Sequence, residues 1–470
     1  MKTKCWLLSA LFILPICSWA QIAGVWSGSL SVGTTSLTVV LAVEQYGDSL
    51  YAELDSPDQY TMGIPVSSIS FLQDTLQFKA NKISASYRGA YNSLTDEVVG
   101  EFKQGRSKLP LALKRIAQRP VIHRPQTPQP PFPYAVEDDI QLQFNHPELG
   151  RVPITGTLTY PSRKEDFNNV LMILVSGSGW QDRDEGIMGH KPFAVLADEF
   201  TRKGFAVFRY DDLPVAYYSK CSTRDFADVA NFLVNYFKNN ENFKSAKVGL
   251  VGHSEGGTIA VMVAAENPKV DFVISLAGMM ASAQSTLLYQ IRELGKADTT
   301  LSEAEVEASI KITSDLYSTI EKAKSQKEAV QKCGELLTGY AASMSKEERE
   351  KIKLTQRDIF GILQNVGSKW FYELFKLNVP KSLKKVKCPV LALNGEKDKQ
   401  VEYQDNFQLF EKFLPKKTRF DAISYPDLNH LFQHCETGLP DEYGKIEETF
   451  SEKVSQDMDF WLKEHFVHEM

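Results

Sequence analysis

The sequence has little cysteine, no excess of positive charge, and no long hydrophobic run beyond its first twenty residues. Its 53 lysines and arginines are outnumbered by 59 acidic residues, and the formal net charge of −6 argues against nucleic acid as a partner. No later window reaches the roughly 18 apolar residues of a membrane-spanning helix, so no stable membrane span is expected. Composition is otherwise that of a globular protein, with 43% hydrophobic and 24% charged residues.

Only four of the six cysteines lie outside the N-terminal segment: Cys221, Cys333, Cys388 and Cys435. They are widely spaced and have no histidine pairs nearby, which argues against a zinc site. We therefore expect no metal and no cofactor. Several disulfide pairings are possible among four cysteines, and packed free thiols are an equal alternative, so the pairing stays open.

The first twenty residues have the pattern of a secretory signal peptide. Lys2 and Lys4 precede an apolar run over residues 6–16, and small residues stand at −3 and −1 of a cleavage site after Ala20. Cleavage before Cys17, as in a lipoprotein, is disfavoured because bulky residues precede it. The pattern predicts export to the periplasm or the extracellular space.

At 470 residues the chain is too long for one ordinary domain. Residues 21–118 form short alternating runs separated by turn residues, which predicts a small antiparallel β-barrel or sandwich. Trp26 and Tyr87 could stack on a sugar there, but aromatic residues at strand positions belong more often to the core. The proline-rich stretch 119–135 predicts a stiff linker.

Residues 136–470 have a different pattern of predicted strands and helices. A predicted hairpin is followed by alternating strands and helices, the βαβ order of a mainly parallel sheet with helices on both faces. The alternation stops at residues 283–384, which are rich in Glu, Lys, Ala and Leu at helical spacing. We interpret this stretch as a helical cap inserted over the site.

Ser254 lies in Gly252-His253-Ser254-Glu255-Gly256-Gly257, between an apolar strand and a run of helix-forming residues. Glycines on both sides leave space for a sharp strand-to-helix turn that lifts the serine hydroxyl clear of the sheet. A serine hydroxyl needs a base and a group that orients the base. The pattern therefore predicts that Ser254 is a nucleophile, with its base and its orienting group elsewhere in the chain.

Asp398 and His430 are the predicted partners, because each follows a predicted strand near its carboxyl end. The chain order Ser, Asp, His is that of the α/β-hydrolase triad and of neither other well-known serine triad. Glu396 is the alternative to Asp398. Asp427 is better explained by a structural turn.

Two further histidines, His253 and His434, lie close in sequence to Ser254 and His430. His253 precedes the serine and cannot easily fold back onto its neighbour, so packing or hydrogen bonding behind the site is expected of it. His434 is four residues past His430 and is a weaker candidate for the base.

An oxyanion hole needs two donors where negative charge develops. The backbone N–H of Glu255 is the first expected donor, and its carboxylate is expected to take no part. The second is expected from the loop that follows an early strand, where the N–H of Ser178 is preferred and Gly179 comes second. The serine hydroxyls of this loop are treated as incidental.

Residues 136–468 resemble the α/β-hydrolase superfamily, specifically secreted bacterial serine esterases with an N-terminal β-domain. Four motifs carry the resemblance: residues 176–184 (SGSGWQDRD), 208–212 (FRYDD), 252–257 (GHSEGG) and 427–432 (DLNHLF). Such relatives usually have His at the position of Ser176, and often Arg-Gly-x-Gly-x-Ser where this chain has residues 213–219 (LPVAYYS). The second departure puts the wall of the pocket in doubt.

The triad predicts a serine hydrolase that cleaves carboxylic esters through an acyl-enzyme, on small-molecule esters with short acyl chains or on acylated saccharides. A serine peptidase or aminopeptidase of the same fold is the first alternative. A carbohydrate- or surface-binding protein with a vestigial hydrolase domain is the second, and an intact triad argues against it. Oligomeric state is left open.

Overall fold

The computed structural model describes residues 21–33, 35–47 and 49–467. It divides the chain into two compact units, one ending at His123 and the other beginning at Arg124. The predicted signal peptide lies outside the described residues. Among the residues that are described, no helix is long and apolar enough to cross a membrane.

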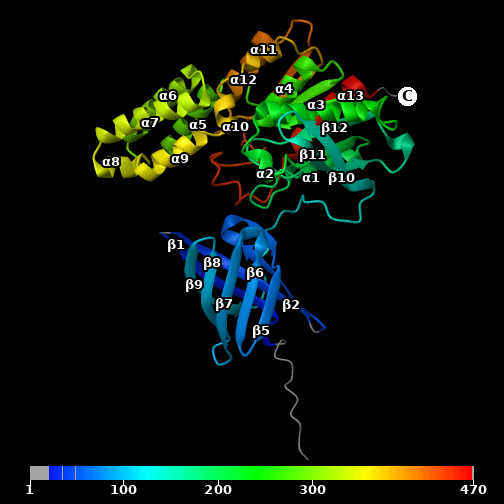
Figure 1. The fold of residues 1–470 in the computed structure, drawn as a ribbon. Helices are drawn as coiled ribbons and strands as arrows, with labels where there is room; N and C mark the ends of the chain where they lie inside the picture. Colours follow the sequence, from blue (N-terminus) through cyan, green and yellow to red (C-terminus); the bar gives the residue numbers. More distant parts are fainter. Residues whose placement is uncertain (1–20, 34, 48, 468–470) are drawn as a thin grey trace, which may run out of the picture. The chain divides into compact units, whose positions relative to one another are not determined.

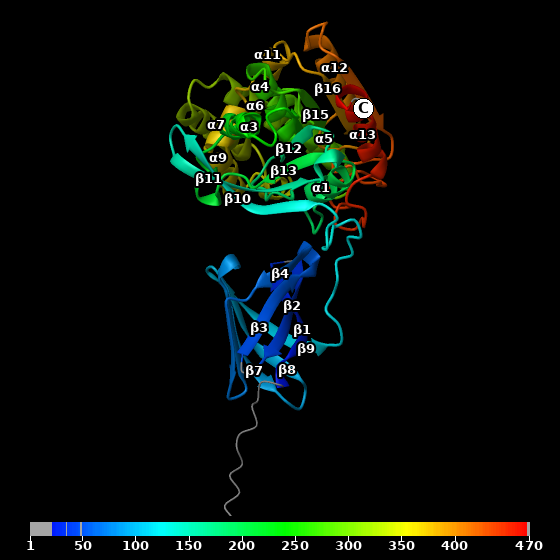
Figure 2. The ribbon, with the colours of Figure 1, turned by 90° about the vertical axis from the view of Figure 1, so that its right-hand side faces the viewer.

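The first unit is a single antiparallel sheet of nine strands, seen in Figure 2. The strands lie in the order β4-β3-β2-β1-β9-β8-β7-β6-β5. Their bounds are β1 (Gly24–Val32), β2 (Thr35–Tyr46), β3 (Ser49–Ser56), β4 (Thr61–Pro65), β5 (Ser68–Leu72), β6 (Thr75–Ala80), β7 (Ala85–Asn92), β8 (Glu97–Gln104) and β9 (Ser107–Ile116). The short helices η2 (Pro57–Gln59) and η3 (Asn81–Ile83) join β3 to β4 and β6 to β7. The sheet confirms the antiparallel prediction.

Trp26 and Tyr87 belong to the core of this unit. Trp26 has no exposed surface and Tyr87 is 3% exposed. The Trp26 indole donates to the Ile22 carbonyl, and the Tyr87 hydroxyl donates to the Val98 carbonyl. The sugar-stacking alternative is therefore wrong for both rings, because alternate residues of a strand point to the same face and these point inward.

The second unit is built on an eight-stranded sheet in the order β10-β11-β13-β12-β14-β15-β16-β17, part of which is visible in Figure 1. Strand β11 pairs antiparallel with β10 and β13, and the pairs from β13 to β17 are parallel. The strands are β10 (Ala135–His146), β11 (Gly150–Tyr160), β12 (Val170–Val175), β13 (Ala206–Tyr210), β14 (Lys247–His253), β15 (Phe272–Leu276), β16 (Val390–Gly395) and β17 (Phe420–Tyr425). This topology agrees with the predicted hairpin and βαβ order.

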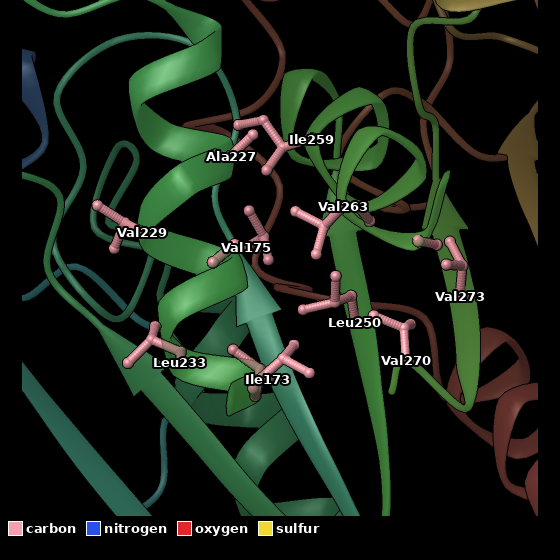
Figure 3. Packing of buried hydrophobic residues seen from close by; sticks show 14 of the residues in the cluster. Ile173, Val175, Ala227, Val229, Leu233, Leu250, Ile259, Val263, Val270 and Val273 are labelled. Carbon is pink, nitrogen blue, oxygen red and sulfur yellow. The ribbon is translucent and has the colours of Figure 1, made fainter. Parts of the chain in front are cut away.

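Helices cover both faces of this sheet, as its apolar strands require. They are α1 (Pro192–Arg202), α2 (Val215–Tyr218), α3 (Thr223–Asn239), α4 (Glu255–Glu266), α12 (Tyr403–Phe413) and α13 (Glu452–Phe466). Ile173 and Val175 of β12 pack in one core with α3 and α4, as Figure 3 shows. Met172 and Leu174 point the other way, into a core shared with α1 and α13. Alternate side chains of β12 therefore pack in two different cores, one on each face of the sheet.

The interruption of the βαβ rhythm is helical, as expected. It contains α5 (Ala283–Ala297), α6 (Glu303–Lys322), α7 (Gln326–Ala342), α8 (Lys346–Lys351), α9 (Gln356–Val366), α10 (Lys369–Leu374) and α11 (Val379–Leu383). Helices α6 to α9 gather in one group in Figure 1 and enclose a separate core around Ile320, Cys333 and Leu337. Helix α11 differs, because its Val379 and Leu383 pack in the core of the main sheet.

Candidate active site

Ser254 occupies a strained turn between β14 and α4. Its φ of 53° and ψ of −119° are rare for a residue with a side chain and are typical of a nucleophile elbow. A Cβ on Gly252 would collide with the Gly256 carbonyl, and one on Gly256 would collide with the Val175 carbonyl. Only glycine fits at both positions, so the spacing in the sequence is a direct requirement of this turn.

Asp398 and His430 are brought together at the carboxyl ends of β16 and β17. His430 Nδ1 lies 2.7 Å from Asp398 Oδ2, and both side chains are almost fully buried. Asp398 Oδ1 accepts hydrogen bonds from the backbone N–H groups of Gln400 and Val401 at 2.7 and 2.8 Å. Asn394 donates to Oδ2 at 3.1 Å. The carboxylate is thus held rigidly, and its bond to Nδ1 leaves Nε2 of His430 as the basic nitrogen.

The alternative acidic and basic residues lie elsewhere. Glu396 is exposed and accepts a hydrogen bond from the Ser424 hydroxyl at 2.7 Å. His434 pairs with Glu448, and its side chain is 61% exposed. Asp427 is solvent-exposed and 3.6 Å from the Lys397 amine. None of these residues contacts the Asp398–His430 pair through its side chain in the hydrogen bonds described for this part of the chain.

His253 lies behind the elbow and connects two other segments. Its Nδ1 is 2.9 Å from Glu185 Oε1, and its Nε2 is 3.0 Å from the His430 carbonyl. Both partners are acceptors, so both ring nitrogens carry protons in the arrangement that satisfies them. Burial opposes this charge, but the Glu185 carboxylate outweighs burial and raises the pKa of His253. The predicted role in hydrogen bonding is confirmed, whereas its partner Glu185 was missed.

The loop of residues 176–181 follows β12 and lies against the elbow. A Cβ on Gly177 would be 3.1 Å from that of Ser254, so the two backbones are adjacent. Three carboxylates hold this loop, and each comes from a different segment: Ser176 Oγ and Gln181 N donate to Asp212, Gly177 N donates to Glu185, and Ser178 Oγ donates to Glu255.

These bonds leave the Ser178 N–H as the preferred second oxyanion donor, since the Gly177 N–H is already bonded to Glu185 at 2.7 Å. That assignment, like the Glu255 N–H, stays a prediction. The treatment of the loop hydroxyls as incidental was wrong, because two of them donate hydrogen bonds to carboxylates, Ser176 to Asp212 and Ser178 to Glu255.

The side chain of Glu255 is the other unforeseen feature. It is 2% exposed and accepts hydrogen bonds from three donors on separate elements. Thr223 Oγ1 at the start of α3 donates at 2.6 Å, Ser178 Oγ at 2.8 Å, and Trp370 Nε1 of α10 at 2.9 Å. Glu255, the residue after Ser254, therefore joins the 176–181 loop to the inserted helices. The sequence offered no signal for this, because the donors are far apart in the chain.

The inserted helices also contact the loop that contains Asp398. Tyr289 of α5 donates from its hydroxyl to the Asp398 carbonyl at 2.7 Å. Lys399 pairs with Glu293 of the same helix at 3.0 Å. The first helix of the insertion and α10 near its end thus each contact a residue beside the site, which agrees with the interpretation as a cap.

Asp212 has the most perturbed acidity among the carboxyl groups at the loop. Burial raises its pKa from 3.8 to about 7, although bonds from Gln181 and Ser176 act in the opposite direction. The charges of Glu255 and Glu185 add to the upward shift. The charges of the neighbouring carboxylates thus make ionisation of Asp212 costly near neutral pH.

The described residues contain no cluster of three or more side chains that could ligate a metal ion. All four described cysteines are free thiols. Burial raises the pKa of Cys221 and of Cys333 to about 11, which keeps these thiols protonated. This resolves the choice left open by the sequence in favour of packed thiols.

A strained serine after a central parallel strand, followed in the chain by an aspartate and a histidine from the next strand ends, defines an α/β-hydrolase. A family model described as "Serine aminopeptidase, S33" matches residues 190–434, more than half of the chain. The protein belongs to this family.

Curated relatives include enzymes that act on esters and thioesters, judged by their names. Esterase EstD of Thermotoga maritima is 24% identical over 297 residues, which is 62% of this chain and 61% of EstD. Acyl-coenzyme A thioesterase 1 of Rattus norvegicus is 25% identical over 157 residues, 32% of this chain and 34% of the thioesterase. The chain thus spans about a third of the length of that thioesterase.

Solved structures that match this chain include Est1E from Butyrivibrio proteoclasticus with ferulic acid bound, at a TM-score of 0.39 and 12% identity. That match covers 67% of this chain and 97% of Est1E. Dienelactone hydrolase from Anabaena variabilis has a TM-score of 0.36 and 14% identity, with 70% of this chain and 99% of the other covered.

Proposed function

We propose that the protein is a serine ester hydrolase. The observation that carries the proposal is the buried pair of Asp398 and His430, with Nδ1 and Oδ2 2.7 Å apart, in the same domain as the strained Ser254. The names of the relatives, esterase and thioesterase, support an activated acyl substrate.

In this mechanism Ser254 Oγ attacks the ester carbonyl while His430 Nε2 takes the hydroxyl proton. Asp398 orients the imidazole and stabilises its charged form. The backbone N–H groups of Ser178 and Glu255 bind the oxyanion. His430 then returns the proton to the departing alcohol, which leaves an acyl group on Ser254.

Water completes the reaction. His430 removes a proton from the attacking water, and the second tetrahedral intermediate releases the carboxylic acid and restores Ser254. We assign small-molecule esters with short acyl chains as the substrate class, with acylated saccharides as one such group. No cofactor takes part in the mechanism.

The direct test is labelling with a fluorophosphonate and mapping of the modified peptide. Ser254 is expected to carry the label. Ser254→Ala is expected to lose the label and to reduce hydrolysis of p-nitrophenyl acetate about 10⁶-fold, with an unchanged thermal midpoint. Turnover that survives this substitution, or a label on another serine, would overturn the proposal.

The description of the family as serine aminopeptidase supports a second candidate. The same triad could cleave an amide at a peptide end. Parallel assays with p-nitrophenyl acetate and L-alanine p-nitroanilide separate the two activities. Efficient turnover of the anilide would favour the peptidase, and ester turnover alone would favour the esterase.

We also propose that the protein is exported through its first twenty residues, whose sequence supports a cleaved signal peptide. N-terminal sequencing of the mature protein from a fractionated culture tests this. A mature chain that starts at Gln21 outside the cytoplasm is the expected result, and an intact N-terminus in the cytoplasm would contradict it.

A further inference from the structure

The nine-stranded sheet of the first unit curves into a partial barrel, and the interior of this barrel is packed tightly along one part of its strands. Trp26 of β1, Leu41 of β2 and Leu113 of β9 have no exposed surface. Tyr91 closes this region by edge contacts to the rings of Trp26 and Phe71, with centroids 5.9 and 5.8 Å apart.

Further along the same strands the interior is hollow. Leu30 of β1, Val39 of β2, Phe102 of β8 and Leu109 of β9 line a cavity of about 610 Å³. Each lies on the same face of its strand as the residues of the packed part, because side chains alternate along a strand. The volume falls in the range of roughly 300–1,000 Å³ that is typical of small-molecule sites.

The wall of this cavity is mainly apolar, and its margin is polar without charge. Nine of the fifteen lining side chains are aliphatic or aromatic. The neutral polar ones lie at the ends of β3, β4, β8 and β9 or beside them: Ser56, Gln59, Thr61, Gln104 and Ser107. Four of these five are exposed, so they form a rim that offers hydroxyl and amide groups.

Asp55 is the one charged residue among the lining side chains described for this cavity, and its charge is already compensated. Arg119 Nη2 and Nε donate to its two oxygens at 2.6 and 2.7 Å. The Gly63 N–H donates to Oδ1 at 2.8 Å. The lining therefore presents no uncompensated charge that would favour an acid or an amine as ligand.

We propose that this cavity binds one neutral, single-chain amphiphile, such as a long-chain alcohol or a monoacyl ester. The alkyl chain lies against Leu30, Val39 and Phe102, where it is removed from water. The hydroxyl or ester group lies at the rim and bonds to Gln104, Ser107 or Gln59. The site belongs to the first unit alone and does not depend on the esterase proposal.

The test uses the full chain and the neutral fluorophore N-phenyl-1-naphthylamine. Saturable binding of one dye per chain is expected, with displacement by 1-decanol. Decanoate and decylamine are the charged comparators of the same chain length and are expected to compete at least tenfold more weakly. Each methylene added from 1-hexanol to 1-decanol is expected to tighten binding about threefold to fourfold.

Two variants fill the cavity, and one serves as a matched control. Leu109→Trp places an indole in the hollow part, and Ser107→Trp places one at the exposed rim, where folding is not at risk. Val99→Trp adds the same ring to the outer face of β8, at a position that is 56% exposed. Both filling variants are expected to weaken dye binding at least tenfold, and the control is expected to stay within twofold of the unmodified chain.

Thermal midpoints for all three variants separate lost binding from lost folding. Absence of saturable dye binding to the unmodified chain would overturn the proposal. Equal binding by Ser107→Trp and Val99→Trp would do the same, because it would place the dye elsewhere in the protein. Competition by decanoate as strong as that by 1-decanol would overturn the assignment of a neutral ligand.

Discussion

Asp398 and Glu255 are both buried carboxylates beside the proposed nucleophile, but they are held in different ways. Three of the four hydrogen bonds to Asp398 come from within residues 394–401, its own loop. The three donors to Glu255 come from residues 178, 223 and 370. The first carboxylate is organised locally, and the second joins parts of the chain that only folding brings together.

The 176–181 loop extends this comparison. The four hydrogen bonds that it donates to side-chain carboxylates go to Asp212, Glu185 and Glu255, none of which lies in the loop itself. If this loop supplies the proposed oxyanion donor, such restraints would hold that donor in place. We therefore expect the locally held Asp398 to govern chemistry, and the distant carboxylates to govern position and stability.

Asp398→Asn is expected to have the largest effect. An amide in place of the carboxylate favours the wrong tautomer of His430, so kcat for p-nitrophenyl acetate should fall about 10⁴-fold. The matched control is Glu396→Gln in the same loop, which should change kcat by less than about twofold because this exposed side chain contacts Ser424. Equal losses in the two variants would contradict the assignment.

Asp212→Asn tests whether this carboxylate, which holds the 176–181 loop, makes stability depend on pH. The pKa of Asp212 is raised to about 7, so the native state keeps a proton that the unfolded state releases above about 4. Stability should therefore fall as pH rises from about 4 to 7, and should stay lower above that range. The variant should remove this slope and gain at most about 4 kcal/mol at pH 8.

Urea unfolding at pH 5 and pH 8 measures the effect of Asp212→Asn. Asp427→Asn, at a carboxylate whose side chain is 73% exposed, is the control and should leave the slope in place. A pH slope that persists unchanged in Asp212→Asn would show that another group controls it.

Glu185→Gln is expected to have the next largest effect, a lower free energy of unfolding. It leaves the protonated His253 without its carboxylate, at a cost of about 3 kcal/mol in the free energy of unfolding at pH 6. The raised pKa of His253 means that this contribution is complete below about 6.5 and is lost as pH rises through the folded value. Glu448→Gln breaks the exposed pair with His434 and should cost less than about 1 kcal/mol.

Glu255→Gln should have a smaller effect, mainly on kcat. Three donors face this carboxylate, and an amide offers them one acceptor atom in place of two. About one hydrogen bond is therefore lost, and kcat should fall about tenfold. Trp370→Phe removes only the bond from α10 and should change KM by about threefold at nearly constant kcat. If both variants match the unmodified enzyme in kcat and KM, the carboxylate has no role in positioning the loop or the cap.

Much of the fold was predictable because its signals are local. Alternation of period two marked the barrel strands, and an apolar run followed by Gly252 and Gly256 marked the elbow. Asp398 and His430 were accessible for the same reason, since each follows its strand within a few residues. The prediction that Trp26 belongs to the core is confirmed.

Glu185, Asp212 and the Glu255 carboxylate were not predictable as parts of the site. Each is an ordinary acidic residue in its local sequence, and its importance comes from donors 8 to 115 positions away. The cavity in the barrel was equally hidden, because Leu30 and Leu41 look alike in an alternating pattern. Whether such a residue fills the interior or lines a hollow depends on the strands opposite.

Local sequence accounts for the order of elements, the turn at Ser254 and the meeting of His430 with Asp398, because short-range sterics and strand ends impose them. Long-range packing accounts for which carboxylates hold the 176–181 loop, how the inserted helices reach the site, and where the barrel is left open. Those features depend on contacts between segments far apart in the chain, and burial gives such contacts their strength.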